Sequence, residues 1–342
     1  MKKWSCVIIT ILVLSSRAWS AEYAVHCLGV LSNTHMSCAI SINNSGKAIG
    51  WSSTSYDARG AFSWTRNEGI KDIRIPNEFD YGGGAINDDG QIVGSRSSSN
   101  GCSGGAVILE PDGSVTLLPS LSGLGCSGGD SINNSGNVAG YTNDQAAIWI
   151  DGELAWYADG TYSQATDINN HNQAIWNAHN FSDGTAQAYI WDNYISIPLA
   201  LLEGTQMCWG YSINDSGVVV GRSGDYAVLW QQNGTAINLA SDTQWWSEAL
   251  DINSDGWVVG QIDCKATLWN PNGSLIDLSH FVNGYESIAY GINDNGWIVG
   301  SVSNPDGFRQ AVVWEPVPEP SSLLALALGL IATGSLIKRR NK

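Results

Sequence analysis

The chain has 342 residues, of which 43% are hydrophobic and 14% charged, and its formal net charge at pH 7 is −16. Nine of the 16 basic residues and 31 of the 32 acidic residues lie between positions 21 and 316, so this body has a net charge of −22. Nucleic acid and anionic lipid would be repelled by such a body, and neither is expected as a partner.

The N-terminus predicts an export signal. Two lysines follow Met1, an apolar run extends from Cys6 to Leu14, and Ala18 and Ser20 are small residues where a signal peptidase reads them. The apolar run is shorter than the roughly 20 residues that a membrane-spanning helix needs. We therefore expect residues 1–20 to be a cleaved signal peptide and the body to be exported.

Residues 21–316 repeat one pattern seven times. Six copies of Ile-Asn-x-x-Gly begin at Ile42, Ile86, Ile132, Ile213, Ile252 and Ile292. In most copies a second Gly stands four residues after the first. The remaining copy, from Ile168, has Asn172 in place of the first Gly and Trp176 in place of the second. Asn is the residue that best replaces Gly at positive φ, so this copy still fits a turn.

A second element follows each Ile by 17 to 23 residues. It is Ala-x-x-Trp, with Leu109 in place of Trp in one copy and the Trp of the others at Trp64, Trp149, Trp191, Trp230, Trp269 and Trp314. Asp-Gly or Asn-Gly pairs come next in several copies, and such pairs between apolar runs indicate hairpins. Each unit of roughly 42 residues thus predicts four short antiparallel strands, the size of a propeller blade.

The ends of the body fit a closed ring. The seventh unit stops at Trp314 without a fourth strand, whereas residues 23–31 form an unassigned strand ahead of the first Ile-Asn turn. If these two segments pair, both chain ends share one blade and no sheet edge stays open. We expect an all-β, seven-bladed β-propeller with four-stranded blades whose last blade is closed by the N-terminal strand. A β-solenoid is the alternative fold.

The repeats resemble the extracellular HAF repeats, in which an Ile-Asn-x-x-Gly-x-x-x-Gly half is followed by His-Ala-Phe-x-x-Trp or a near variant. The segment 60–64, Gly-Ala-Phe-Ser-Trp, comes near that form, with Gly in place of His and a shorter final spacing. The resemblance spans nearly the whole body. It implies a secreted repeat scaffold and carries no catalytic residues.

Six cysteines lie in the body, an even number that favours disulfides in an exported chain. The predicted pairs are Cys102 with Cys126, each in a Gly-Cys-Ser-Gly-Gly loop, Cys27 with Cys38, and by elimination Cys208 with Cys264. No Cys-x-x-Cys or His-Glu-x-x-His motif is present, so neither a metal nor another cofactor is expected.

Nothing in the sequence argues for catalysis. The five histidines are scattered, and 31 acidic residues make some carboxylate pair inevitable, so such a pair carries no signal. The Asp- and Asn-rich turns lack the alternating ligands and the final bidentate acid of a calcium loop, and turn chemistry accounts for them. A bidentate arginine clamp could be assembled from the six arginines of the body, but no motif points to one.

Aromatic residues between the repeats are the candidates for a binding surface. Trp245 and Trp246 are adjacent, so in an extended segment they face opposite ways and one should be partly exposed. Trp209 and Tyr285 occupy the equivalent connection in other units. These connections would share one face of a propeller, where the rings could serve as platforms for sugars. Packing between blades is the alternative role.

The C-terminal segment, residues 317–342, predicts a sorting signal. Val317, Pro318, Glu319 and Pro320 precede 17 uncharged residues, 321–337, and a basic cluster ends the chain. This arrangement resembles the PEP-CTERM sorting signal of Gram-negative bacteria. The resemblance implies an inner-membrane anchor with the basic end in the cytoplasm, and processing by an exosortase-type transpeptidase. The body then reaches the cell surface or the extracellular matrix. A plain C-terminal anchor is the alternative.

These elements predict a non-enzymatic exported protein of the cell surface or extracellular matrix, which binds polysaccharide or matrix partners. The alternative is a carbohydrate-active propeller enzyme, either a glycosidase or a lyase.

Overall fold

The computed structural model describes residues 23–54, 59–74, 81–96, 104–121, 126–159, 162–180, 182–240, 245–282, 286–303 and 307–317. Residues Tyr23–Glu315 form one compact unit. A second unit comprises residues 1–22 and 316–342. The predicted signal peptide, apolar segment and basic tail, and Pro318, Glu319 and Pro320, lie outside the described residues. Within the described ranges, no helix has the length and apolar character needed to cross a membrane.

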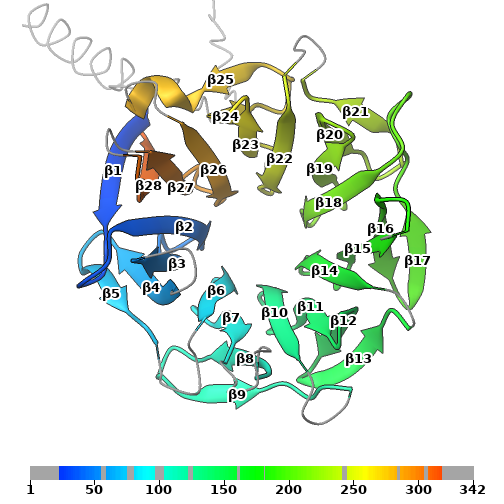
Figure 1. Ribbon diagram of the computed structural model, residues 1–342, viewed down its shortest axis with the longest axis horizontal. Helices are drawn as coiled ribbons and strands as arrows, with labels where there is room; N and C mark the ends of the chain where they lie inside the picture. Colours follow the sequence, from blue (N-terminus) through cyan, green and yellow to red (C-terminus); the bar gives the residue numbers. More distant parts are fainter. Residues whose placement is uncertain are drawn as a thin grey trace, which may run out of the picture. The chain divides into compact units, whose positions relative to one another are not determined.

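The compact unit consists of seven four-stranded sheets arranged in a ring, and the strand that ends in the repeat Ile is innermost in each and is counted as its first strand (Figure 1). Blade 1 consists of β2 (Met36–Ile42), β3 (Ala48–Ser53), β4 (Arg59–Thr65) and β5 (Gly69–Asp72). Blade 2 consists of β6 (Tyr81–Ile86), β7 (Ile92–Ser95), β8 (Ala106–Leu109) and β9 (Val115–Leu117). Blade 3 consists of β10 (Ser127–Ile132), β11 (Val138–Thr142), β12 (Gln145–Ile150) and β13 (Glu153–Tyr157). Blade 4 consists of β14 (Ser163–Ile168), β15 (Ala174–Asn180), β16 (Thr185–Asp192) and β17 (Ile195–Pro198). Blade 5 consists of β18 (Cys208–Ile213), β19 (Val219–Ser223), β20 (Tyr226–Trp230) and β21 (Ala236–Asn238). Blade 6 is β22 (Ser247–Ile252), β23 (Val258–Ile262), β24 (Lys265–Trp269) and β25 (Leu275–Asp277), followed by the short 3-10 helix η1 (Leu278–Val282).

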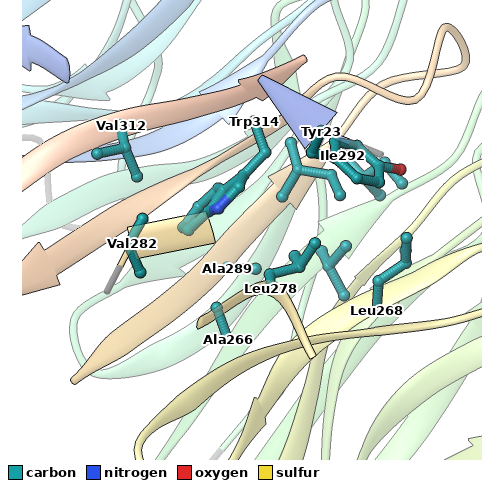
Figure 2. Close-up of a cluster of buried hydrophobic side chains, with 11 residues drawn as sticks. Tyr23, Ala266, Leu268, Leu278, Val282, Ala289, Ile292, Val312 and Trp314 are labelled. Carbon is teal, nitrogen blue, oxygen red and sulfur yellow. The ribbon is translucent and has the colours of Figure 1, made fainter. Parts of the chain in front are cut away.

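Blade 7 contains both ends of the unit. It is made of β26 (Ser287–Ile292), β27 (Ile298–Ser303), β28 (Arg309–Pro316) and, as its outer strand, β1 (Tyr23–Gly29) (Figure 1). Tyr23 belongs to the same buried cluster as Trp314 and Leu278, as Figure 2 shows. The Glu315 carboxylate contacts His26 at 3.0 Å and Arg66 of blade 1 at 2.7 Å. The predicted seven-bladed propeller and its closure by the N-terminal strand are confirmed, and the solenoid alternative is wrong.

In blade 1 the second Gly of the repeat is required by a bulge in the innermost strand. In blade 1 the pairing register shifts between Ala39 and Ser41. The bulge brings the Cys38 carbonyl oxygen to 1.9 Å from where a Cβ on Gly50 would lie, so only Gly fits. Blade 4 has the same register shift, between Ala165 and Asp167, but it carries Trp176 at the Gly position, and the Trp176 ring stacks on Tyr189 at 4.3 Å.

The Trp of Ala-x-x-Trp packs between blades. Trp149, Trp230 and Trp269 are fully buried. Each indole N–H donates to a carbonyl oxygen in the connection from the preceding blade, at distances of 2.7 to 3.0 Å. The equivalent indole N–H groups of Trp191 and Trp314 are buried without a hydrogen-bond partner among the described residues, so this bond joins the blades at some repeats and not at all of them.

A repeated Ser also joins the blades. It stands five residues before the repeat Ile at Ser37, Ser127, Ser163, Ser247 and Ser287. Each buried Oγ accepts the N–H of an Ala in the third strand of the preceding blade at 2.9 to 3.0 Å. In blade 5 Cys208 takes this place, and its Sγ accepts the N–H of Ala188 at 3.5 Å.

Candidate functional site

The turns between the first and second strands form one face of the ring, which we call the Asn-turn face. It consists of residues 43–47, 87–91, 133–137, 169–173, 214–218, 253–257 and 293–297. The Asn of every repeat is buried there, and its Nδ2 donates to the main-chain carbonyl of the equivalent Asn in the next blade at 2.9 to 3.2 Å. Seven such bonds make a closed circle.

A cavity of about 190 Å³ lies at the centre of this face, lined by the Ile, the Asn and the following residue of every blade. The following residues are Asn44, Asp88, Asn134, Asn170, Asp215, Ser254 and Asp294. Several of these side chains bond to a neighbour in an adjacent blade; for example, both Asn44 and Asn134 donate to Asp88 Oδ2 at 3.0 Å. Because the ring residues bond to one another, the turns serve to connect blades.

Part-buried carboxylates bridge the innermost strands. Asp167 accepts the Ser131 hydroxyl from blade 3 and the N–H of Ile213 from blade 5. Asp251 accepts the Ser212 hydroxyl from blade 5 and the N–H of Ile292 from blade 7. Asp130 accepts Gln164 Nε2 at 2.9 Å. Burial raises the pKa of Asp130 and of Asp251 to about 7, and it also raises the pKa of Asp167.

The opposite face of the ring carries exposed aromatic rings, and we call it the aromatic face. The exposed rings are Tyr162, Trp245 and Trp246, which directly precede first strands, and Phe308, which precedes β28 of blade 7; the part-buried Trp209 lies at the start of β18 on the same face. The side chains of Trp245 and Trp246 are 61% and 39% exposed. Both tryptophans, rather than one, are therefore available to a ligand. Of the other predicted platform residues, Tyr285 lies outside the described residues.

Main-chain bonds hold the two exposed tryptophans between blades 5 and 6. The N–H of Ser247 donates to the Asp225 carbonyl in the blade 5 turn at 2.9 Å. The N–H of Asp263 in the blade 6 turn donates to the Trp246 carbonyl at 3.0 Å. These connections and the turns between the second and third strands thus lie on one face of the ring.

Trp209 differs from the exposed pair. Its ring is part-buried, with His179 edge-on at 4.3 Å between ring centroids and the Arg222 guanidinium 5.7 Å from its centroid. Its indole N–H is buried and has no hydrogen-bond partner among the described residues. The Trp209 ring therefore packs against Arg222 and His179, and it is less accessible to a ligand than the rings of Trp245 and Trp246.

A polar network that the sequence analysis missed lies next to Trp209. Arg222 Nε donates to Tyr211 Oη at 3.1 Å, and Gln261 Nε2 donates to Glu248 Oε1 at 2.7 Å. Burial raises the pKa of Glu248, and it raises the pKa of Tyr211 to about 12. Blade 7 has a similar pair, in which Arg309 Nη1 donates to Tyr290 at 3.4 Å. Aligning the repeats would have found the signal, because Tyr211 and Tyr290 both stand two residues before the repeat Ile.

Two of the predicted disulfides are wrong. Cys27, Cys38, Cys208 and Cys264 all carry thiols. Cys27 is exposed on the outer strand β1, whereas Cys38 is buried on the innermost strand β2. The Cys208 thiol faces Ala188 of blade 4, away from the blade 6 turn that holds Cys264. Cys126 is disulfide-bonded, but Cys102 lies outside the described residues, so that pairing stays a prediction.

Residues 316–340 match the PEP-CTERM protein-sorting motif, which confirms the predicted sorting signal. A chain with this signal is an exported protein that an exosortase sorts. In a comparison with curated proteins, nothing matches this chain.

Solved structures share the fold at low sequence identity. A streptogramin B lyase has a TM-score of 0.60 and 13% identity, and the match covers 88% of this chain and 100% of the lyase. A catalytically inactive virginiamycin B lyase from Staphylococcus aureus, with quinupristin, has a TM-score of 0.58 and 11% identity over 86% and 100% of the two chains. YCF48 bound to D1 peptide has a TM-score of 0.53 and 13% identity over 89% and 100%. At these identities the likeness shows the fold alone.

Proposed function

We propose that this protein is a non-enzymatic component of the cell surface or extracellular matrix, built on an HAF-type repeat scaffold, which binds polysaccharide through its aromatic face. The observation that carries the proposal is the exposed pair Trp245 and Trp246. Large aromatic side chains are usually buried in a soluble domain, and an exposed pair indicates a binding surface. Indole rings offer sugars an apolar face and a polar edge.

The polar groups beside the tryptophans suit a polyhydroxyl ligand. Arg222 supplies donors, Glu248 supplies acceptors and Tyr211 can do both, while the buried Gln261 holds Glu248 in place. They are held in one network, so a sugar chain would meet hydrogen-bonding groups already in place. An acidic body with a mixed, aromatic-rich face favours polysaccharide over a polyanion.

For sorting, we propose that the chain is held in the inner membrane by residues 321–337 until an exosortase-type transpeptidase removes the tail at Val317–Pro320. Mass spectrometry of protein recovered from the surface of a Gram-negative host should find a chain that begins at Ala21 and ends near this motif. Recovery of only chains that end at Lys342 would contradict the processing step.

A second candidate function is that of a carbohydrate-active enzyme, either a glycosidase or a lyase. The observation that favours it is Glu248, whose carboxyl group is part-buried beside Tyr211 and Arg222 and has a raised pKa. Such a group can act as a general acid.

One experiment separates the two functions. The full chain, purified in detergent, is screened for retention on bacterial and plant polysaccharides, and each incubation is assayed for new reducing ends. The proposal predicts retention without new reducing ends. Released oligosaccharides would establish the enzyme instead, and release that stops in the Glu248→Gln variant would assign it to this carboxyl group.

A further inference from the structure

We infer that Arg222 determines the specificity of the aromatic face, and that it selects a polysaccharide that carries isolated carboxylate groups, such as uronate sugars on an otherwise neutral chain. This inference rests on the proposed function and adds the chemical class of the ligand.

The Arg222 side chain is held on three sides. Its guanidinium lies 5.7 Å from the Trp209 ring centroid, Nε donates to Tyr211 Oη at 3.1 Å, and Nη1 donates to the Gly224 carbonyl at 3.4 Å. Among the hydrogen bonds of the described residues, none uses Nη2. A planar guanidinium that is fixed in place with a vacant edge is the arrangement that binds a carboxylate with two hydrogen bonds.

The positive charge of Arg222 is not matched by an ion pair. In the part of the chain that the structure describes, Arg66 and Arg74 form ion pairs with Glu315 and Asp72, but Arg222 forms none within 4 Å. The residues that accept its bonds are a phenol and a carbonyl, both neutral. The neighbouring acid Glu248 interacts with Arg222 through the shared Tyr211 hydroxyl without a direct ion pair, so the guanidinium can still take a carboxylate from outside the chain.

Arg222 lies at the same end of blade 5 as the exposed tryptophans. It is two residues before Gly224, and the neighbouring Asp225 carbonyl accepts the N–H of Ser247, which directly follows Trp246. A sugar chain stacked on Trp245 or Trp246 therefore brings its other units toward the guanidinium.

Nearby acids limit what the carboxylate-bearing ligand can be. Tyr211 Oη is shared between Arg222 and Glu248, at 3.1 and 3.5 Å, and Asp225 stands in the adjoining turn. These groups and the net charge of −22 would repel a densely charged polyuronate. A single carboxylate on a neutral chain can bind the Arg222 guanidinium with little repulsion from the rest of the body, because salt screens acidic residues that lie more than about 10 Å away.

The test compares two forms of one polymer. Glucuronoxylan carries sparse uronates on a neutral backbone, and its carboxyl-reduced form differs only in lacking their charge. The full chain in detergent should bind glucuronoxylan at least about tenfold more tightly than the reduced form, as expected for charge-assisted hydrogen bonds. Arg222→Gln should remove this difference, and Arg222→Lys should restore only part of it, because an ammonium lacks the planar fork.

The control variant is Arg66→Gln, which makes the same change to an exposed arginine of blade 1 and should bind both forms like the parent. Equal binding of the two forms by the parent, or a difference that survives in Arg222→Gln, would overturn the inference and leave the proposed function standing. A parent that binds neither form overturns the inference. A different result contradicts the proposed function itself: the Trp245→Ala/Trp246→Ala variant would then bind every polysaccharide like the parent.

Discussion

The side-chain amide of Asn293 donates to the main-chain carbonyl oxygen of Asn43 at 2.9 Å, across 250 positions of the chain. This bond completes the circle of seven equivalent bonds on the Asn-turn face. The Oδ1 of each Asn also accepts an N–H of its own turn, so one side chain shapes the turn and joins two blades. The circle ties blade 7 to blade 1 near the axis, and β1 ties the same blade at the rim.

Replacing one Asn of the circle should destabilise the whole ring. Asn253→Ala removes the bond that Asn253 Nδ2 donates to the Asn293 carbonyl at 3.2 Å and the bond that its Oδ1 accepts from the Trp257 N–H at 2.9 Å. Loss of these two hydrogen bonds should lower the free energy of unfolding by about 2 kcal/mol. Urea denaturation measures this loss. Asn272→Ala, at an exposed turn, is the control, and an equal effect of both variants would contradict a special role for the circle.

Removing the closing strand should open the ring. Deletion of residues 21–31 takes away β1 and Leu31, and exposes the edge of β28. An exposed edge pairs with other chains, so we expect aggregation or a large fall in melting temperature. Light scattering and calorimetry provide the readouts. A deleted chain that stays monodisperse and melts like the parent would show that closure is not needed.

The fold could be predicted because its determinants recur along the chain. Ile42 and its six equivalents, with Asn after each, mark every innermost strand and turn, and Trp314 without a following strand implied a partner at the N-terminus. Asn172 adopts φ of 62°, so the expected positive φ of this degenerate copy is confirmed. The disulfides could not be predicted in this way, because the number of cysteines does not show whether a thiol faces its own blade or the neighbouring one.

Cys208 should behave as a substitute for Ser. Its Sγ accepts the Ala188 N–H at the place where five other blades use a Ser hydroxyl at 2.9 to 3.0 Å. Cys208→Ser should therefore match or exceed the stability of the parent, whereas Cys208→Ala should lose about 1 kcal/mol with its acceptor. If Cys208 were bonded to Cys264, Cys208→Ser would instead lose about 3 kcal/mol. Thermal unfolding of the three chains distinguishes these outcomes.

Stability should fall as the pH rises from 4 to 7. Burial raises the pKa of Asp130 from 3.8 to about 7, so in this range the folded chain holds a proton that the unfolded chain releases. The resulting stabilisation is complete below about pH 4 and is lost as the pH passes 7. Exposed acids such as Asp112, whose pKa is lowered, change charge only below this range.

Asp130→Asn tests the pH dependence. The variant keeps an acceptor for Gln164 but cannot ionise, so it should be more stable than the parent at pH 8, by about 2 kcal/mol, and lose less stability between pH 4 and 8. Melting temperatures across this range, with the exposed Glu153→Gln as control, give the answer. An unchanged slope in Asp130→Asn would rule out this carboxyl group as the cause.

The candidate site was predictable only in part. The position of Trp245 and Trp246 between two units predicted that one of them is partly exposed, because adjacent residues of an extended segment face opposite ways, whereas the structure exposes both. Arg222, Tyr211 and Glu248 come from three different strands of two blades, and their contacts depend on register between strands that no local pattern shows. Six arginines among many acids left their partners undetermined until the strands were placed.

Binding to the aromatic face is tested most directly by titrating the full chain with the polysaccharide that retains it most strongly. Trp245→Ala/Trp246→Ala should bind at least about tenfold more weakly than the parent, because two exposed indole platforms are lost. Tyr194→Ala is the matched control, since this ring is 69% exposed in the turn between β16 and β17, and its affinity should stay within about twofold of the parent. A double variant that binds as tightly as the parent would contradict the proposal that this face is the binding site.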